Sequence, residues 1–382
     1  MKNIGITTRF YNNENYGGVL QAYALAEVLS QMGFQAEQIL IKSESKRSKQ
    51  AKPFNICSEL KRIIKRNIIR TLNKIILFFL KKKLTQRSIA FERFIDCVPH
   101  SEKVYTSSNI EESLNKYDIF ITGSDQVWTM QWYNSSYFLD FVPRDKIKIS
   151  YAASMPDVNI SNKEKEIVKN HLESFDAISV RESNTVIFLE ELTGKKTECV
   201  LDPTLLLGKE DWDKICTERI VKDKYIFCYF LGNDMRERKI AKEFAKKLKL
   251  KIVTLPHLDL IKKSDIFFGD RKLYNVSPQM FISLIKNAKY VLTDSFHAAV
   301  FSNIFRTKYY VFERGGTVEM SSRISTLLKM TNASERYLNN NKANTDYMLS
   351  IKDMEVGDPP DEFKAMRHKS FEFLRKNIDR KG

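Results

Sequence analysis

A chain of 382 residues, of which 43% are hydrophobic and 29% charged, is too long for one ordinary core, so we expect a soluble globular protein of about two domains. Its five cysteines are scattered and form no C-x-x-C pair, which argues against a zinc site and against a disulfide framework. The N-terminus lacks the apolar core of a signal peptide, and no run of about 18 uncharged apolar residues occurs. The sequence therefore predicts a cytoplasmic protein without a transmembrane helix.

The net charge of +16 is concentrated in one segment. Residues 42–87 contain 15 Lys and Arg against two acidic residues, an excess of 13 positive charges. Apolar residues recur there at helical spacing from Leu60 to Leu80, and Lys61, Arg62, Lys65 and Arg66 occupy other faces. The pattern predicts a basic amphipathic helix. It either packs in a domain with a solvated charged face or lies on an anionic membrane surface. No nucleic-acid-binding signature accompanies the charge, so nucleic acid is not an expected partner.

The first half of the chain alternates between apolar strands and helices. A strand at 3–8, a helix at 19–32 with Gly33 as its C-cap, and a strand at 35–41 form a βαβ unit. The basic segment and a helix near 87–97 follow. We then expect strands at 117–122, 148–152 and 177–180, with a helix at 163–174.

The second half repeats this alternation. Strands are expected at 225–231, 251–255, 290–293 and 309–312, and helices at 235–248, 278–286, 297–303, 321–329 and 361–378. The pattern predicts an α/β protein with two mainly parallel sheets. We expect one domain over 1–205, with a basic helical insert at about 42–97, and a second over 206–382 that includes the terminal helix.

Polar clusters follow several of these strands. Open α/β sheets bind ligands beyond the carboxyl ends of their strands, so two halves facing each other would gather such clusters around one cleft. The candidate residues are Asn15, Gly17, Gly18, Ser124, Asp125, Arg181, Glu182, Asp294, Ser295 and His297.

Each cluster also has a structural interpretation. The glycines could provide positive φ in a turn, Ser124 and Asp125 could cap a helix, and Arg181 with Glu182 could form a surface ion pair. His297 could be a satisfied core histidine. The Asn15–Gly18 stretch lacks P-loop and dinucleotide-binding spacing, but an anion site at the following helix remains open. For the stretch Trp128–Tyr137, which includes Trp132 and Tyr133, we favour core packing over a sugar-stacking face.

Six stretches together resemble the polysaccharide pyruvyl transferase family. They occur in the family's order and span about 15–330: N-Y-G-G-V-L-Q-A-Y-A-L, I-T-G-S-D-Q-V-W, Y-A-A-S-M, A-I-S-V-R-E, V-L-D-P-T-L-L and V-L-T-D-S-F-H-A-A-V-F-S. The resemblance implies two Rossmann-like domains with a deep interdomain cleft, similar to GT-B glycosyltransferases. It also implies transfer of a pyruvyl group from phosphoenolpyruvate to a sugar of a bacterial surface polysaccharide or its lipid-linked precursor, which forms a ketal.

The reaction implied by this resemblance assigns a role to each candidate residue. Histidine has an ordinary pKa near neutrality, so His297 suits the proton donor, and Asp125 suits the base for the sugar hydroxyls. Arg181 suits the donor's anionic groups. No step requires a metal or a cofactor besides phosphoenolpyruvate as donor substrate.

One departure from the family pattern concerns the donor. Family members usually carry Arg-Leu-His where this chain has Ser295-Phe296-His297, and a serine lacks the charge and the bidentate fork of a guanidinium. Arg323 is a candidate replacement. Two rival functions remain open: a GT-B-type glycosyltransferase that uses a nucleotide sugar, and a non-catalytic glycan-assembly protein.

Overall fold

The computed structural model describes residues 2–42, 59–258, 262–314, 319–339, 342–351 and 357–379. In the helices that begin at Glu59 and Glu319, it describes side chains from Phe78 and from Ser322 onward. Across these ranges, no helix combines the length and the apolar content that a membrane crossing needs.

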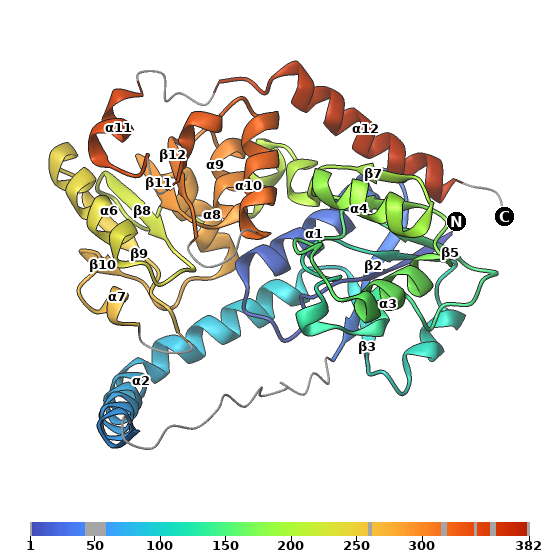
Figure 1. Ribbon diagram of the computed structural model, residues 1–382, viewed down its shortest axis with the longest axis horizontal. Coiled ribbons are helices and arrows are strands. Elements are labelled where there is room, and N and C mark those ends of the chain that lie inside the picture. The colour runs from blue at the N-terminus through green and yellow to red at the C-terminus, as the bar shows by residue number, and fades with distance from the viewer. Residues whose placement is uncertain are drawn as a thin grey trace.

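A parallel sheet forms the centre of the first half (Figure 1). Its strand order within the described residues is β3 (His100–Tyr105), β2 (Gln35–Ile41), β1 (Asn3–Thr7), β4 (Ile119–Thr122) and β5 (Ile147–Ser150). The short parallel pair β6 (Ile178–Val180) and β7 (Thr197–Cys199) extends this edge, because Ile149 bridges to Ala177 and Ala153 to Val180. The carboxyl ends of β1, β4, β6 and β7 therefore lie along one side of the half.

A second parallel sheet forms the centre of the second half. Its order within the described residues is β10 (Arg271–Lys272), β9 (Lys251–Thr254), β8 (Tyr225–Tyr229), β11 (Tyr290–Thr293), β12 (Tyr309–Phe312) and β13 (Tyr337–Leu338). All four residues of β12 are buried, as in a parallel sheet covered by helices on both faces. The expected α/β class with parallel sheets is confirmed.

Helices connect and cover these strands. In the first half they are α1 (Tyr16–Gln31), α2 (Glu59–Asp96), α3 (Asn162–Leu172) and α4 (Ser183–Thr193), and α5 (Lys209–Ile215) follows the first sheet. In the second half they are α6 (Met235–Leu248), α7 (Lys263–Ile266), α8 (Pro278–Lys286), α9 (Phe296–Ile304), α10 (Glu319–Met330), α11 (Thr345–Ser350) and α12 (Asp361–Ile378). Gly33 has φ +89° and ends α1 as expected.

The basic segment and the expected helix near 87–97 form a single helix, α2. No Gly or Pro interrupts residues 59–96, so nothing in the backbone stops the helix between the two expected pieces. The backbone of this segment is helical, as its periodicity predicted. The placement of the side chains of Lys61, Arg62, Lys65 and Arg66 lies outside the described residues.

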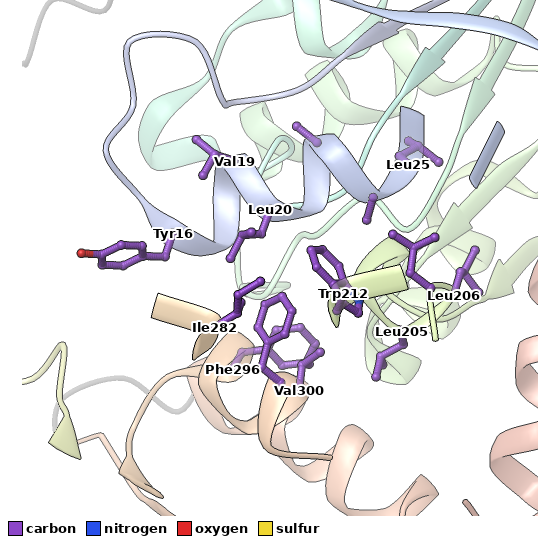
Figure 2. Close-up of a cluster of buried hydrophobic side chains, with 14 of the residues drawn as sticks. Tyr16, Val19, Leu20, Leu25, Leu205, Leu206, Trp212, Ile282, Phe296 and Val300 are labelled. Atoms are coloured by element: carbon purple, nitrogen blue, oxygen red, sulfur yellow. The ribbon is translucent and has the colours of Figure 1, made fainter. Parts of the chain in front are cut away.

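A continuous apolar core joins the two halves (Figure 2). Tyr16 at the start of α1 stacks on Phe281 of α8, with ring centroids 4.4 Å apart and planes 8° apart. The Tyr16 hydroxyl also donates to the Val276 carbonyl at 3.0 Å. Such a stacked aromatic pair contributes about 0.5–1.5 kcal/mol beyond its burial. The N-terminal turn of α1 is therefore held against the second half.

The last helix, α12, crosses back over the first half (Figure 1). Ser370 accepts a hydrogen bond from the Leu201 amide at 3.0 Å, and the Phe373 ring lies 6.4 Å from that of Tyr151. The chain thus passes between the halves at 203–216 and again at 357–361. These two crossings and the apolar core set the relative position of the loops that face each other.

Candidate functional site

Asp202, directly after β7, is the centre of a buried polar cluster. Its Oδ2 accepts hydrogen bonds from Arg181 Nη1 at 2.7 Å and from Ser124 Oγ at 2.8 Å. Its Oδ1 accepts from the amide and hydroxyl of Thr204, at 3.0 and 2.6 Å. Burial opposes ionisation of the Asp202 carboxyl, but the neighbouring His297, Arg181 and Thr204 outweigh it and hold its pKa well below the usual range. Asp202 is therefore a fixed negative charge.

Arg181, directly after β6, is buried rather than part of a surface ion pair. Besides Asp202 it contacts Glu182 Oε1 at 3.3 Å, and its guanidinium carbon lies 4.7 Å from the centroid of the Phe296 ring. Burial alone would lower the pKa of Arg181, but Asp202, Glu182 and Asp125 outweigh that effect and raise it. Arg181 thus keeps its charge where the first half meets α9 of the second.

Ser124 and Asp125, at the end of β4, do not cap a helix. Ser124 bonds to Asp202, and Asp125 adopts φ +73°, which is uncommon for a residue with a side chain. The Asp125 carbonyl accepts from the Ser154 amide at 3.0 Å and fixes this turn. The side chain is 17% exposed, and its Oδ1 lies 3.9 Å from Arg181 Nη2. Asp125 is therefore the more accessible of the carboxylates around Arg181.

His297 lies in the first turn of α9 and packs directly on the first turn of α1. A Cβ placed on Gly17 would lie 2.0 Å from His297 Nδ1, so only a glycine allows this approach. Gly17 and Gly18 are helical and have no positive φ, so the interpretation that they provide positive φ in a turn is wrong. Asn15 is the N-cap of α1, and its side chain accepts from the Gly18 amide at 3.2 Å.

Two buried nitrogens of this cluster have no hydrogen-bond acceptor within the described part of the chain. They are His297 Nε2, which lies 3.7 Å from Asp202 Oδ2, and Arg181 Nη2. A buried donor without an acceptor costs about 1–3 kcal/mol, so such groups usually mark a place where a ligand or water binds. His297 Nε2 is therefore not satisfied within the described residues, and its ring lies against Gly17 at the N-terminus of α1, which favours an anion.

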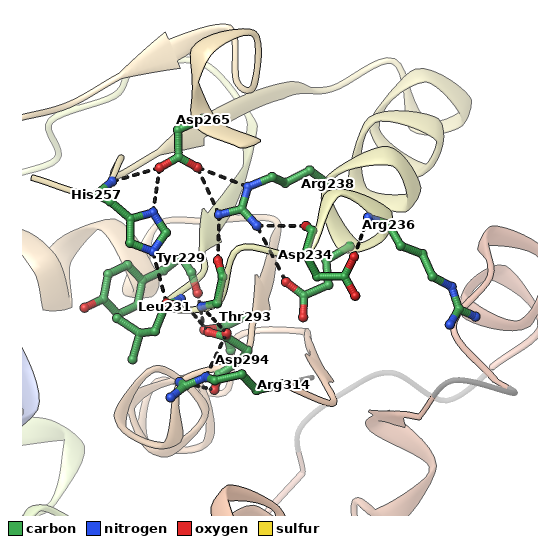
Figure 3. A network of polar contacts seen from close by, with 12 residues as sticks. Tyr229, Leu231, Asp234, Arg236, Arg238, His257, Asp265, Thr293, Asp294 and Arg314 are labelled. Atoms are coloured by element: carbon green, nitrogen blue, oxygen red, sulfur yellow. Dashed lines mark hydrogen bonds and ion pairs between the residues drawn. The ribbon is translucent and has the colours of Figure 1, made fainter. Parts of the chain in front are cut away.

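Asp294, at the end of β11, organises the facing loops of the second half (Figure 3). Its carboxylate accepts from the amides of Leu231 and Gly232, both at 2.7 Å, and from Arg314 Nε at 3.0 Å. The side chain is fully buried. Its oxygens are thus occupied by backbone amides and Arg314, so the structure places Asp294 as a support for the loops after β8 and β12. Ser295 follows as the N-cap of α9, and its amide donates to the Thr293 hydroxyl at 3.0 Å.

The network extends to the loop after β9 (Figure 3). Asp265 binds Arg238 Nη2 at 2.9 Å and His257 Nδ1 at 2.6 Å, while His257 Nε2 lies 3.0 Å from the Leu231 carbonyl. Both partners of the imidazole only accept, so both of its nitrogens must donate and His257 is a cation. Burial opposes this charge, but Asp265 and the carbonyl outweigh it and raise the pKa of His257.

Three arginines converge on the candidate site. Arg323 of α10 is buried, and burial followed by the charge of Arg181 lowers its pKa to about 10, with Arg314 acting in the same direction. Glu182 and Asp125 partly offset this effect. The second half therefore brings Arg323 and Arg314 within electrostatic reach of the cluster around Arg181, and an anion between them would relieve their repulsion.

A cavity of about 610 Å³ lies between the halves next to this cluster. The loop before α1 contributes Asn13 and Asn15, and the loops after β8 and β9 contribute Leu231 and His257. Leu84 of α2 and Tyr274 close another side. Asn15 is the N-cap of α1, so the cavity reaches the N-terminus of this helix.

Three important residues were not among the sequence candidates: Asp202, Arg314 and Phe296. Asp202 lies beyond the end of β7 and Arg314 beyond the end of the buried strand β12, so the rule that found the other clusters could have found them. The expectation of core packing for the stretch Trp128–Tyr137 is wrong in part. Trp128 and Tyr137 are buried as expected, but Trp132 and Tyr133 are 44% and 41% exposed.

Comparison with known proteins places this geometry in context. The family model for polysaccharide pyruvyl transferase matches residues 15–315. Among curated proteins, no sequence matches significantly. Solved structures of similar fold include the UDP-GlcNAc 2-epimerase of Methanocaldococcus jannaschii, with TM-score 0.56, 13% identity and coverage of 98% of this chain and 99% of that one.

Two further epimerase structures show the same likeness. The UDP-N-acetylglucosamine 2-epimerase of Rickettsia bellii has TM-score 0.54 and 11% identity, with 99% and 98% of the two chains covered. The Neisseria meningitidis enzyme bound to UDP-GlcNAc has TM-score 0.53 and 11% identity, with 98% and 100% covered. At such low identity these likenesses show the fold, which is GT-B-like. The family model covers most of the chain, and it leads to one conclusion: the chain belongs to the polysaccharide pyruvyl transferase family.

Proposed function

We propose that the protein transfers a pyruvyl group from phosphoenolpyruvate to two hydroxyls of a sugar in a surface polysaccharide or its lipid-linked precursor. The observation that carries this proposal is the pair of buried, unpartnered nitrogens, Arg181 Nη2 and His297 Nε2. Arg181 Nη2 lies 3.9 Å from the partly exposed carboxylate of Asp125, and the His297 ring lies against Gly17 at the N-terminus of α1. An anionic donor would supply their missing acceptors.

The chemistry divides among these residues. His297 protonates the methylene carbon of phosphoenolpyruvate, which makes the neighbouring carbon electrophilic. A sugar hydroxyl attacks that carbon and gives its proton to Asp125. The bond to phosphate breaks, and phosphate leaves with the electron pair. The second hydroxyl then attacks the same carbon, closes the ketal and returns its proton to the imidazole of His297. Asp202 Oδ2 lies 3.7 Å from His297 Nε2, so this carboxylate faces the imidazole that donates the proton.

The donor's two anionic groups need cations that Ser295 does not provide. Arg181, Arg323 and Arg314 supply three guanidiniums from both halves, so the charge that family members place at the position of Ser295 comes from elsewhere in this chain. Phe296 supports this arrangement, because its ring lies against the Arg181 guanidinium. Asn15, Gly17 and Gly18 contribute the helix N-terminus.

Donor binding tests the proposal directly. We expect phosphoenolpyruvate to raise the melting temperature of the protein, whereas common nucleotide sugars leave it unchanged. In Arg181→Lys the charge remains but the planar fork is lost, so the donor KM should rise about tenfold or more. Arg219→Lys, at an arginine that contacts backbone carbonyls of 221 and 223, is the matched control. Protection by a nucleotide sugar instead would favour a glycosyltransferase, and protection by neither would favour a non-catalytic assembly protein.

We further propose that the acceptor is met at an anionic membrane surface. The described side chains of α2 begin at Phe78. Phe78 and Phe79 are 73% and 76% exposed, and the exposed Lys81–Lys83 follow them. Directly after α7, Phe267 is 85% exposed and its carbonyl accepts from Lys242 Nζ at 2.6 Å. Exposed aromatic rings beside lysines suit the boundary between headgroups and acyl chains of anionic lipid.

Vesicle flotation checks this membrane proposal. The protein should bind phosphatidylglycerol vesicles at low salt and bind phosphatidylcholine vesicles much more weakly. High salt should release it, because the Debye length falls from about 10 Å at 0.1 M to about 3 Å at 1 M. Each Phe buried in lipid contributes about 1.5–3 kcal/mol, so Phe79→Ser or Phe267→Ser should weaken binding roughly tenfold. Charge reversal at Lys61, Arg62, Lys65 and Arg66 should weaken it as well.

Ile187→Ser is the control for these variants, since Ile187 is 62% exposed on α4 and away from the proposed surface. It should leave vesicle binding unchanged. If all of the protein stays in the soluble fraction with anionic vesicles at low salt, α2 is an ordinary packed helix with a solvated basic face.

A further inference from the structure

Trp132 differs from the other two tryptophans of the chain in its exposure. Trp128 and Trp212 are fully buried, whereas Trp132 is 44% exposed. It ends the short helix η2 (Met130–Trp132) in the connection between β4 and β5. Of the three indoles, that of Trp132 is therefore the one that a ligand from solvent can reach.

The neighbours of Trp132 hold it on a rigid base. Trp128 precedes it in the same loop and is buried. The Trp128 Nε1 donates to the Tyr137 carbonyl at 3.1 Å. On the other side, the Tyr133 hydroxyl lies 2.7 Å from His171 Nε2 of α3. The segment is therefore anchored at both flanks of the exposed ring. A side chain fixed in this way loses little conformational freedom when a ligand binds to it.

Arg9, from the loop after β1, lies against the face of this ring. Its guanidinium carbon is 4.8 Å from the centroid of the Trp132 ring. A cation on one face of an indole is a favourable contact and fixes the orientation of the ring. Arg9 thus braces the indole from the side of the first sheet.

A chain of contacts connects Trp132 to the candidate site. The Arg9 carbonyl and Asp125 Oδ2 lie 3.0 and 3.4 Å from the point where a Cβ on Gly18 would be, and Gly17 next to it contacts His297. Burial raises the pKa of Tyr137 to about 12, and the two charges that act on it are Arg9 and Asp125. Arg9, Asp125 and Tyr137 are therefore close neighbours, and Trp132 lies on the Asp125 side of the site.

We propose that Trp132 is the platform for the acceptor sugar. The C–H face of a neutral pyranose stacks on the indole, and hydroxyls at the edge of the sugar ring reach toward Asp125. This inference rests on the proposed function, in which Asp125 takes protons from those hydroxyls. The donor's anionic groups bind around Arg181 and His297, and the acceptor sugar binds on the Trp132 side of Asp125.

Tryptophan fluorescence gives a test that needs no turnover. Because Trp128 and Trp212 are buried, collisional quenching by acrylamide reports mainly on Trp132. The probes are methyl glycosides of glucose, galactose, mannose and N-acetylglucosamine, with uridine as an alternative stacking ligand, each with and without phosphoenolpyruvate. We expect at least one glycoside to lower the quenching constant of the wild type at least twofold. Trp132→Phe should remove both the quenchable fraction and the effect.

Kinetics separate stacking from a structural role. Trp132→Ala should raise the acceptor KM tenfold or more and leave the donor KM within about twofold, while Trp132→Phe should recover most of the affinity because it keeps an aromatic face. Leu349→Ala, at an exposed apolar side chain of α11 in the second half, should leave both constants unchanged.

Three outcomes would overturn the platform. They are quenching that no glycoside lowers, protection by uridine alone, and an acceptor KM that Trp132→Ala does not change. Thermal protection by phosphoenolpyruvate in Trp132→Ala would then show that donor binding stands without the platform. If phosphoenolpyruvate did not protect the wild type either, the proposed function itself would be wrong.

Discussion

Replacing His297 by glutamine is expected to lower turnover by about 10²–10⁴-fold, the usual effect of losing a general acid. Glutamine keeps a polar side chain of similar reach but cannot deliver a proton to the methylene carbon of the donor. The loss should appear in kcat, since Arg181, Arg323 and Arg314 still hold the donor. Phosphate release from phosphoenolpyruvate in the presence of a glycan acceptor measures it.

A matched histidine distinguishes catalysis from general damage. His100 starts β3 at the edge of the first sheet, and its Nδ1 lies 2.9 Å from the Ser101 carbonyl. His100→Gln should keep near-normal turnover, and both variants should melt within a few degrees of the wild type. If His297→Gln turns over at the wild-type rate, His297 has no part in the proton transfer.

The alternation of strands and helices could be predicted because it depends on local pattern. Buried strands such as β11 and β12 are continuous apolar runs, and Gly33 supplies the left-handed residue that ends α1. Short edge strands such as β10 and β13 are two residues each, too short for any periodicity to reveal them. Their pairing is set by tertiary contacts rather than by their own composition.

Candidate residues at strand ends were predictable for the same reason, but their partners were not. Ser124, Arg181 and Asp202 meet although 57 and 78 positions separate Ser124 from the other two. A sequence shows that Asp202 follows an apolar stretch, but it does not show that two donors converge on one oxygen. The exposure of Trp132 is similar, since only the packed neighbours decide which aromatic of that loop faces solvent.

Gly17 shows most clearly what sequence reasoning could not supply. Its neighbour His297 lies 280 positions along the chain, and the two meet only because α1 and α9 pack across the two halves. A Cβ on Gly17 would lie 2.0 Å from Nδ1, 2.6 Å from Cε1 and 2.7 Å from Cγ of the imidazole. The ring cannot keep its position beside even one added methyl group.

Gly17→Ala is therefore expected to lower turnover by about 100-fold or more, because a displacement of about 1 Å in a catalytic group can cost that much. Stability should change less, since alanine is about 1 kcal/mol better than glycine within a helix and overpacking costs about 1–3 kcal/mol. Gly208→Ala is the control: the nearest atom to its added Cβ would be an Asp211 carboxylate oxygen at 3.6 Å, an ordinary contact.

The double variant Gly17→Ala/His297→Ala separates the two effects of the methyl group. Removing the imidazole relieves the clash, so the double variant should melt above Gly17→Ala. Its turnover should match His297→Ala alone, because the methyl group acts only by moving a ring that is no longer there. Full activity in Gly17→Ala, or a further loss in the double variant, would mean that the contact between α1 and His297 does not position the proton donor.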